Sequence, residues 1–365
     1  MIRRNFLLLI VGLLAFTLVS GGIFLLTTQP KPALDNPAKI SKPLAFRASI
    51  PYWDQEKAFA SFKSNVSKFD HLSLFWYYLN SEGKIQPYQY AKEDKTIIDF
   101  AHKNGIKVGA LIANLPDEDG SWDSQRVEKV IANPEARKKH IADIVTTLER
   151  LNFDGVNIDY EQVDQNQKDN FSLFIKELKE ELSKKGKFVG VALHPKTAER
   201  KKGEEIGWFQ DWKALAGSAD QLYIMAYGEH WDESPAGPIA SEGWIRQIIS
   251  YVESLNLPRE NIFLGTPLYG YAWPKGSNEA ATGLTFEEIQ AILRSQSINY
   301  KWDEKAKAPF FTYIKSGQEY EVWFENSRSL DAKVRLAYEA GLAGVSFWRL
   351  GGEDPLIWDT IRASY

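Results

Sequence analysis

Hydrophobic runs of strand length recur along the chain from residue 44 onwards, and a gap of helix length follows nearly every one. Strands that alternate with helix-length segments are typical of βα units, in which the strands run parallel. Eight such units in one chain favour an α/β fold of the closed (β/α)8 TIM barrel type over an open sheet. The eight runs are Phe46–Tyr52, His71–Tyr77, Lys107–Ala113, Phe153–Glu161, Phe188–His194, Gln221–Tyr227, Ile262–Leu268 and Ala343–Trp348.

The gaps between these runs carry helix patterns with recognisable starts and ends. Asn133 followed by Pro134 is a typical helix start, because asparagine caps the first turn and proline fits its first position. An apolar stripe at intervals of three and four residues indicates a second helix, which Gly186 ends. The stripe consists of Phe171, Phe174, Ile175, Leu178 and Leu182. Amphipathic helices of this kind suit the outer layer of a barrel.

The gap after the seventh run, residues 270–342, is much too long for a single helix. Within it, Thr285 and Glu288 form a capping box that opens a short helix. Strand-like pieces follow at Phe310–Ile314 and Tyr320–Phe324. We therefore expect a small α+β insertion after strand seven, over residues 274–340 or thereabouts.

The N-terminus carries a membrane signal. After Arg3 and Arg4, an uncharged and largely apolar run extends from Phe6 to Leu26, long enough to cross the hydrocarbon layer as a helix. The run continues past its only cluster of small residues, Ser20–Gly22, which favours an uncleaved anchor over a cleaved signal peptide. Basic residues stay on the cytoplasmic side. We expect a single-pass protein of the cell membrane with its folded domain outside, or a secreted protein if the signal is cleaved.

The segment from Thr27 to Pro43 has the composition of an extended spacer. It contains Pro30, Pro32, Pro37 and Pro43, scattered charges and few large apolar residues. The predicted organisation is a cytoplasmic stub and membrane anchor over 1–26, a Pro-rich linker over 27–43, and a barrel domain over 44–365.

Composition excludes several classes of partner and chemistry. A net charge of −4 leaves no basic footprint of the kind that nucleic acids need. Without cysteine the chain has no disulfide, thiolate metal site or thiol nucleophile. The five histidines are too scattered to form a metal pair, so we expect no metal. We also expect no other cofactor, and we expect the protein to be a monomer. Twelve tryptophans, 16 tyrosines and 20 phenylalanines are suited either to the core or to stacking on sugar rings.

The segment Asp154–Glu161, DGVNIDYE, carries the candidate chemistry. In a strand alternate residues share a face, so Asn157, Asp159 and Glu161 point one way and the apolar residues between them the other. Inward carboxylates at the C-terminal end of a barrel strand lie where barrel enzymes place their catalytic residues. Two carboxylates on one face repel, which should raise one pKa and keep that group protonated near neutral pH. Glu161, nearer the mouth, is the candidate general acid.

This motif resembles the DGxDxDxE signature of glycoside hydrolase family 18, and the resemblance extends over nearly all of residues 44–365. Met225–Tyr227 is similar to the family's sixth-strand M-x-Y element, and Gly265–Gly270 to its seventh-strand element. Elements near the C-terminus resemble the bacterial branch that includes spore-cortex and peptidoglycan glucosaminidases. They are Val322–Glu325, Ser329, Lys333, Gly344–Trp348 and Leu350–Asp354.

The resemblance implies a chitinase-like role for each matching residue. Glu161 would protonate the glycosidic oxygen, while the substrate's own 2-acetamido group attacks the anomeric carbon in place of a protein nucleophile. Asp159 would orient the acetamide and stabilise the oxazolinium intermediate. Tyr227 would hydrogen-bond the acetamide carbonyl. The candidate catalytic residues are therefore Glu161, Asp159, Tyr227, Asn157 and Asp154, and the candidate substrate-binding residues are Met225 in the pocket wall, Trp348 as its floor, and Tyr52.

Two positions depart from the family pattern. Asn157 stands where many members have a third aspartate that shares a proton with the next one, and an amide cannot take up a proton near neutral pH. An asparagine at this position also resembles the pattern of the family's peptidoglycan-acting branch. Gly228 follows Tyr227 where the family commonly has aspartate, and Glu229 or a water would have to replace that carboxylate.

The sequence supports three functional hypotheses. The first is an enzyme that hydrolyses β-1,4 bonds in N-acetylglucosamine-containing polysaccharides, peptidoglycan or chitin oligomers, by substrate-assisted retaining catalysis. The presence of both Asp159 and Glu161 favours it. The second is a non-catalytic lectin that binds N-acetylated glycans at the cell surface, which Gly228 favours. The third, a structural subunit of a polysaccharide-handling membrane assembly, would need a second domain or partner surface.

Overall fold

The computed structural model describes residues 43–116 and 121–361, which lie in one compact unit. The predicted anchor, and the predicted linker apart from Pro43, lie outside these ranges. Within them, no helix combines the length and the apolar character that a membrane crossing requires.

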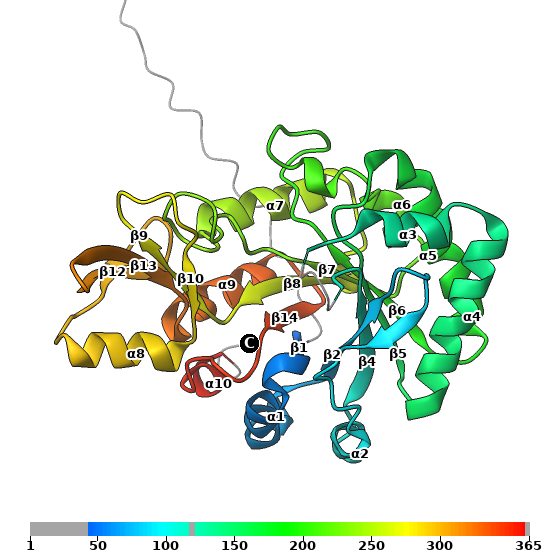
Figure 1. Cartoon of the computed structure of the whole chain (residues 1–365), viewed down its shortest axis with the longest axis horizontal. Helices are drawn as coiled ribbons and strands as arrows, with labels where there is room; N and C mark the ends of the chain where they lie inside the picture. Colours follow the sequence, from blue (N-terminus) through cyan, green and yellow to red (C-terminus); the bar gives the residue numbers. More distant parts are fainter. Residues whose placement is uncertain (1–42, 117–120, 362–365) are drawn as a thin grey trace, which may run out of the picture. The chain divides into compact units, whose positions relative to one another are not determined.

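Eight parallel strands form a closed barrel (Figure 1). The barrel closes because the first strand pairs with both the second and the last, with Ala48 opposite Leu72 on one side and Phe347 on the other. Each of the eight predicted runs overlaps one of these strands, which confirms the predicted TIM barrel. In barrel order they are β1 (Ala45–Pro51), β2 (His71–Leu79), β4 (Lys107–Ala113), β5 (Gly155–Asp159), β6 (Phe188–Leu193), β7 (Gln221–Ile224), β8 (Ile262–Pro267) and β14 (Gly344–Trp348).

Helices cover the outside of the barrel, so its strands are buried on both faces and read as continuous hydrophobic runs. In β5, Val156 and Ile158 are fully buried in the main hydrophobic core with the apolar stripe of α5. The helices are α1 (Gln55–Ser64), α2 (Lys95–Lys103), α3 (Ser124–Ile131), α4 (Pro134–Leu151), α5 (Lys168–Ser183), α6 (Trp212–Ala216), α7 (Glu242–Ser254), α9 (Ser327–Glu339) and α10 (Ile357–Thr360). Short 3-10 turns lie at Tyr52–Asp54, Val66–Lys68, Gln165–Gln167, Glu205–Gly207 and Arg259–Asn261.

The predicted helix starts are present. Asn133 caps α4, its Oδ1 accepting the Ala136 N–H at 2.9 Å, and Pro134 occupies the first turn. A short strand, β3 (Ile85–Pro87), pairs antiparallel with the end of β2 and was not predicted, because three residues carry no readable alternation.

The segment between β8 and α9 folds as a five-stranded antiparallel sheet with one helix. Thr285 and Glu288 form the predicted capping box at the start of that helix. Figure 1 shows this sheet on the opposite side of β8 and β14 from α4 and α5. The insertion spans residues 270–324 rather than 274–340, because α9 packs on β8 and β14 as part of the barrel layer. Its elements are β9 (Gly270–Pro274), β10 (Thr282–Leu284), α8 (Phe286–Ser295), β11 (Lys301–Asp303), β12 (Ala308–Lys315) and β13 (Gln318–Phe324), in sheet order β10-β9-β13-β12-β11.

Candidate active site

A pocket of about 190 Å³ lies at the C-terminal ends of the barrel strands. Asp159 and Glu161 enter it from the end of β5, and they are the only carboxylates among the described residues that line it. Tyr160, between them, points outward, where its hydroxyl lies 2.7 Å from Nε2 of His140. The predicted alternation therefore holds through Glu161, although β5 ends at Asp159. Six predicted residues line the pocket: Asn157, Asp159, Glu161, Met225, Tyr227 and Trp348.

Both carboxyl groups bind their protons more tightly than in water. Burial raises the pKa of the Asp159 carboxyl to about 7, and the charge of Arg47 opposes this rise. Burial, and then the neighbouring charge of Asp159, raise the pKa of the Glu161 carboxyl well above its ordinary value. The sequence predicted that repulsion between the two carboxylates would raise the pKa. Desolvation is the larger cause of the raised pKa values, because the pocket walls cover the end of the strand. This raised pKa favours the protonated form of Glu161, which a general acid requires.

Arg47 enters the pocket from β1 and is not among the predicted site residues. Its guanidinium donates a 2.9 Å hydrogen bond to Oγ of Ser346 and lies 3.6 Å from the centre of the Tyr223 ring. Among the described residues that line the pocket, Arg47 is the only cation. Its positive charge stabilises the ionised form of Asp159. The signal was present in the sequence, because Arg47 and Ser49 are polar positions that alternate with apolar ones in the first run.

Asn157 occupies the floor of the pocket between neighbouring strands. Its Nδ2 donates to Oγ of Ser73 at 3.1 Å, and its side chain fills the space that a Cβ would take at Gly109 and Gly190. An amide in this position holds the floor by donating a hydrogen bond and does not exchange a proton with Asp159.

Two further residues that the sequence did not reveal contact Glu161. Asn114, which follows β4, bonds both backbone groups of Glu161: Oδ1 accepts its N–H at 2.8 Å and Nδ2 donates to its carbonyl at 2.9 Å. His194, which follows β6, places Nε2 3.3 Å from Oε2 of Glu161. The sequence signal for both was weak: Asn114 is a polar residue directly after a predicted strand, and His194 is the last residue of one.

The apolar part of the pocket comes from several strand ends. Trp348, the last residue of β14, makes edge contact with Trp53 and a tilted contact with Phe75, with ring centres 6.2 Å and 5.9 Å apart. Met225 and Tyr227 follow β7, and burial, then Asp159 and Glu161, raise the pKa of the Tyr227 hydroxyl well above its ordinary value. Tyr227 therefore stays a neutral hydrogen-bond donor.

Tyr52 and Asp154 are not among the pocket residues. Tyr52 stacks flat on Tyr88, with ring centres 3.9 Å apart, and Trp53 lines the pocket instead. Arg47 and Ser49 line the pocket, so the period of two along β1 assigns Tyr52 to the opposite face, together with Ala48 and Ile50 of the core.

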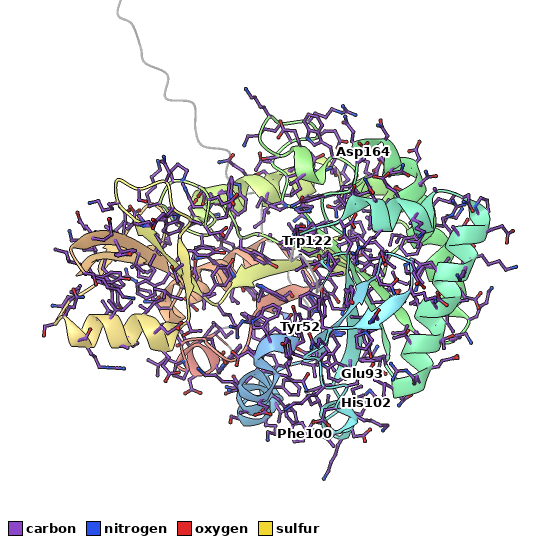
Figure 2. All side chains as sticks on the ribbon, in the orientation of Figure 1. Tyr52, Glu93, Phe100, His102, Trp122 and Asp164 are labelled. Carbon is purple, nitrogen blue, oxygen red and sulfur yellow. The ribbon has the colours of Figure 1, made fainter. Side chains whose placement is uncertain are left out.

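Asp154 lies at the opposite end of β5 from the carboxylate pair. Its Oδ2 accepts the Val108 N–H at 2.7 Å and lies 2.8 Å from Nε2 of His102. Figure 2 shows His102 well separated from Trp122, which lines the pocket. Asp154 precedes the strand, and the two ends of a barrel strand face opposite ends of the barrel. Its contacts tie β4 to the start of β5 and do not reach the pocket.

A second hollow, of about 470 Å³, lies between the barrel and the insertion. It shares Trp53 and Trp348 with the first pocket, and Tyr269, Tyr271 and Arg349 also line it. The two hollows are therefore contiguous along an aromatic wall.

The sequence model of glycosyl hydrolases family 18 matches residues 48–353, which contain the whole pocket apart from Arg47. The chain belongs to this family. It is a glycoside hydrolase, as the signature in β5 predicted.

Bacterial family 18 proteins are among its relatives. The cortical fragment-lytic enzyme of Bacillus anthracis is 28% identical over 295 residues, which cover 79% of this chain and 66% of that enzyme. The uncharacterised glycosylase YvbX of Bacillus subtilis (strain 168) is 26% identical over 306 residues, 82% of this chain and 88% of the relative.

Solved structures agree with the family assignment. A chitinase from Chromobacterium violaceum ATCC 12472 matches with a TM-score of 0.79 at 26% identity, covering 88% of this chain and 98% of that one. The Bacillus cereus spore cortex-lytic enzyme SleL matches with a TM-score of 0.80 at 23% identity, covering 88% and 74%, and supports the fold alone.

Within this family 18 site, the glycine at position 228 has a backbone reason. Gly228 has φ of +81°, a conformation that residues with a side chain rarely adopt. The adjacent Glu229 does not replace the missing carboxylate, because its oxygens accept the N–H and the hydroxyl of Ser241 at 2.6 Å and 2.9 Å. Glu229 instead anchors the start of α7.

Proposed function

We propose that this family 18 glycosidase hydrolyses β-1,4 bonds in N-acetylglucosamine-containing glycans, that is, peptidoglycan or chitin oligomers. The observation that carries the proposal is the placement of Asp159 and Glu161 in one buried pocket. The names of two relatives, a cortical fragment-lytic enzyme and a chitinase, support glycans of this class.

In the proposed reaction Glu161 gives its proton to the glycosidic oxygen as the bond from that oxygen to the anomeric carbon breaks. The carbonyl oxygen of the substrate's 2-acetamido group forms the new bond to the anomeric carbon, and an oxazolinium ion results. Asp159 accepts a hydrogen bond from the acetamide N–H and balances the positive charge of the ion. Water then attacks the anomeric carbon, Glu161 takes up its proton, and the acetamide is restored.

The remaining pocket residues would hold the sugar in this geometry. The neutral hydroxyl of Tyr227 would donate to the acetamide carbonyl, and the indole of Trp348 would lie beneath the sugar ring. Met225 would line the space around the acetamide. The contiguous second hollow, with Trp53 and Arg349, has room for a further sugar, which supports binding of an oligomer rather than a single sugar.

A second candidate function is glycan binding without cleavage. Gly228 and the engagement of Glu229 by Ser241 leave the acetamide site without the extra carboxylate that family 18 enzymes commonly have. Against this, the lectin hypothesis assigns no role to a buried Glu161 whose carboxyl has a raised pKa.

Incubation of the full-length chain with purified peptidoglycan and with chitin oligomers separates the two functions. Mass spectrometry of the products should show N-acetylglucosamine-containing fragments with wild type and far less product with Glu161→Gln over the same time. Retention of both glycans on the wild-type protein without any product would support the lectin instead.

We also propose that the chain is anchored in the cell membrane with the barrel outside. Support comes from the uncharged run Phe6–Leu26 after Arg3 and Arg4. Membrane fractionation and protease treatment of intact cells test this. Most of the protein should sediment with membranes and be accessible from outside, whereas recovery as a soluble form shortened at its N-terminus would contradict the anchor.

A further inference from the structure

The side chain of His194 contacts the candidate general acid Glu161. Nε2 of His194 lies 3.3 Å from Oε2 of Glu161, and the two side chains are only 7% and 14% exposed. No hydrogen-bond partner satisfies this buried nitrogen within residues 43–116 and 121–361. A buried ring nitrogen without a partner is costly, and a small rotation of the Glu161 carboxyl would satisfy it.

Gln210 holds the backbone that carries the His194 imidazole. The backbone N–H of His194 donates to Oε1 of Gln210 at 2.8 Å, and Nε2 of Gln210 donates to the backbone carbonyl of Ala192 at 2.9 Å. Lys196 adds a 2.7 Å bond to the Gln210 carbonyl. Because these bonds fix the backbone on both sides of the ring, His194 presents Nε2 to Glu161 from a rigid support.

His194 is neutral in this environment. Burial, and then the positive charge of Lys196, lower the pKa of the imidazole to about 4. The ionisable groups around the contact are Lys196 beside His194, and Asp159 and Tyr227 beside Glu161. A neutral imidazole offers one N–H without adding a charge that would drive the proton off Glu161.

We propose that His194 is a positioning residue for the general acid, with its Nε2–H donating to Oε2 of Glu161. The acid proton then resides on Oε1, the oxygen left to face the glycosidic bond. When Oε1 gives its proton to the leaving sugar, the imidazole N–H stabilises the carboxylate that remains, and His194 keeps its own proton throughout. The inference rests on the proposed hydrolytic function. His194 thereby gives Glu161 a hydrogen-bond donor, whereas Asn157 cannot take part in a proton relay because an amide does not exchange a proton near neutral pH.

The first test compares leaving groups in the full-length chain. A sugar leaving group needs protonation, whereas a nitrophenolate leaves with little help, so a residue that acts through the acid affects mainly the former. In His194→Leu, kcat/KM on chitin oligomers should fall about 10- to 100-fold, the range for a hydrogen bond to a charged group, with a much smaller loss on a nitrophenyl glycoside. His194→Gln, which keeps an N–H at a similar reach, should restore most of the loss.

Matched variants separate positioning from packing. His194→Asn is polar but too short to reach Glu161, so it should behave like His194→Leu; it also serves if the leucine variant fails to fold. His230→Gln is the control, because His230 contacts the carbonyl of Pro235 and does not line the pocket. Equal losses on both leaving groups, or no rescue by glutamine, would show a structural role and overturn the proposal.

A second test does not depend on turnover. Carbon-13 NMR of carboxyl-labelled glutamate follows the titration of Glu161, assigned by the signal missing in Glu161→Gln. Loss of a donor to the carboxylate should raise the titration midpoint in His194→Leu, and glutamine should return it toward wild type. An unchanged midpoint overturns the contact even in an active enzyme. Failure of wild type to cleave any N-acetylated glycan overturns the proposed function and leaves the titration to decide the contact.

Discussion

The side-chain amide of Asn114 bonds both backbone groups of Glu161, accepting the N–H at 2.8 Å and donating to the carbonyl at 2.9 Å. Asn114 is itself fully buried, and its Nδ2 also donates to the carbonyl of Asp123 at 3.0 Å. Gln162, next in the chain, has a positive φ of 54°. The peptide that carries the acid leaves the barrel strand by a sharp turn, and the clamp by Asn114 sets its direction.

Asn114→Ala should therefore lower both the stability of the fold and the rate of catalysis. Loss of the clamp leaves a buried N–H and a buried carbonyl without partners, which costs about 1–3 kcal/mol each when fully buried. Misplacement of the acid by about 1 Å can reduce the rate about 100-fold. Urea unfolding and kcat/KM on chitin oligomers measure the two effects. Asn114→Asp keeps the acceptor oxygen, so its stability and its kcat/KM should lie between those of wild type and of Asn114→Ala. A lower stability with unchanged kcat/KM would show that Asn114 only supports the fold.

The barrel and the carboxylate pair were predictable because their signals are local. The period of two within Asp154–Glu161 sets which side chains share a face, and that period can be read along one segment. Asn114 is 47 residues from Glu161, and its contact depends on the pairing of β4 with β5, which no local pattern reveals. The misassignment of Tyr52 has the opposite cause. Tyr52 was assigned to the pocket although the period of two that places Arg47 and Ser49 there assigns Tyr52 to the opposite face.

Glu161→Gln tests the acid directly. The amide has the size of the carboxyl but cannot give a proton, so kcat should fall by about two to four orders of magnitude while glycan binding is retained. Hydrolysis rates and equilibrium binding of chitin oligomers check the two parts. Glu180→Gln, an exposed position on α5, is the matched control and should equal wild type. Residual activity above about a tenth of wild type would remove Glu161 from the role of acid.

Arg47 should set the acidic limb of the pH profile. Asp159 acts as an anion, so activity is lost as pH falls through its pKa, which lies at about 7 with Arg47 opposing the rise. Arg47→Met removes the positive charge, raises that pKa further and should move the acidic limb of kcat/KM to higher pH. Arg47→Lys keeps the charge and should leave the limb near its wild-type position. An acidic limb that is the same in all three proteins would contradict the role of the charge.

Asp159 should reduce the stability of the fold at high pH. Its folded pKa of about 7 lies above the ordinary value of 3.8, so the folded state holds a proton that the unfolded state has lost in this window. The contribution of Asp159 to stability therefore falls as pH rises from the lower value to the higher one and then levels off. Asp159→Asn should raise the unfolding midpoint above pH 7 and have much less effect near pH 4. An equal shift at both pH values would point to packing rather than ionisation.

The last prediction concerns the nucleophile. Retaining glycosidases that use a protein nucleophile place a second carboxylate across the bond, and inverting enzymes place one to hold water. Among the described residues that line the pocket, the only carboxylates are Asp159 and Glu161, two residues apart at the end of one strand, so both approach the sugar from the same side. The acetamide of the substrate is the group left to attack.

Cleavage should therefore require an N-acetylated sugar on the non-reducing side of the bond, and the deacetylated glycan should bind without being cut. Attack by the acetamide and then by water inverts the anomeric carbon twice, so a β-linked substrate should release the β anomer first. Proton NMR of the initial products, recorded before mutarotation, distinguishes the outcomes. Initial release of the α anomer would indicate direct attack by water. Equal rates on acetylated and deacetylated glycans would indicate a nucleophile other than the acetamide, and either result would refute the mechanism while leaving the family assignment intact.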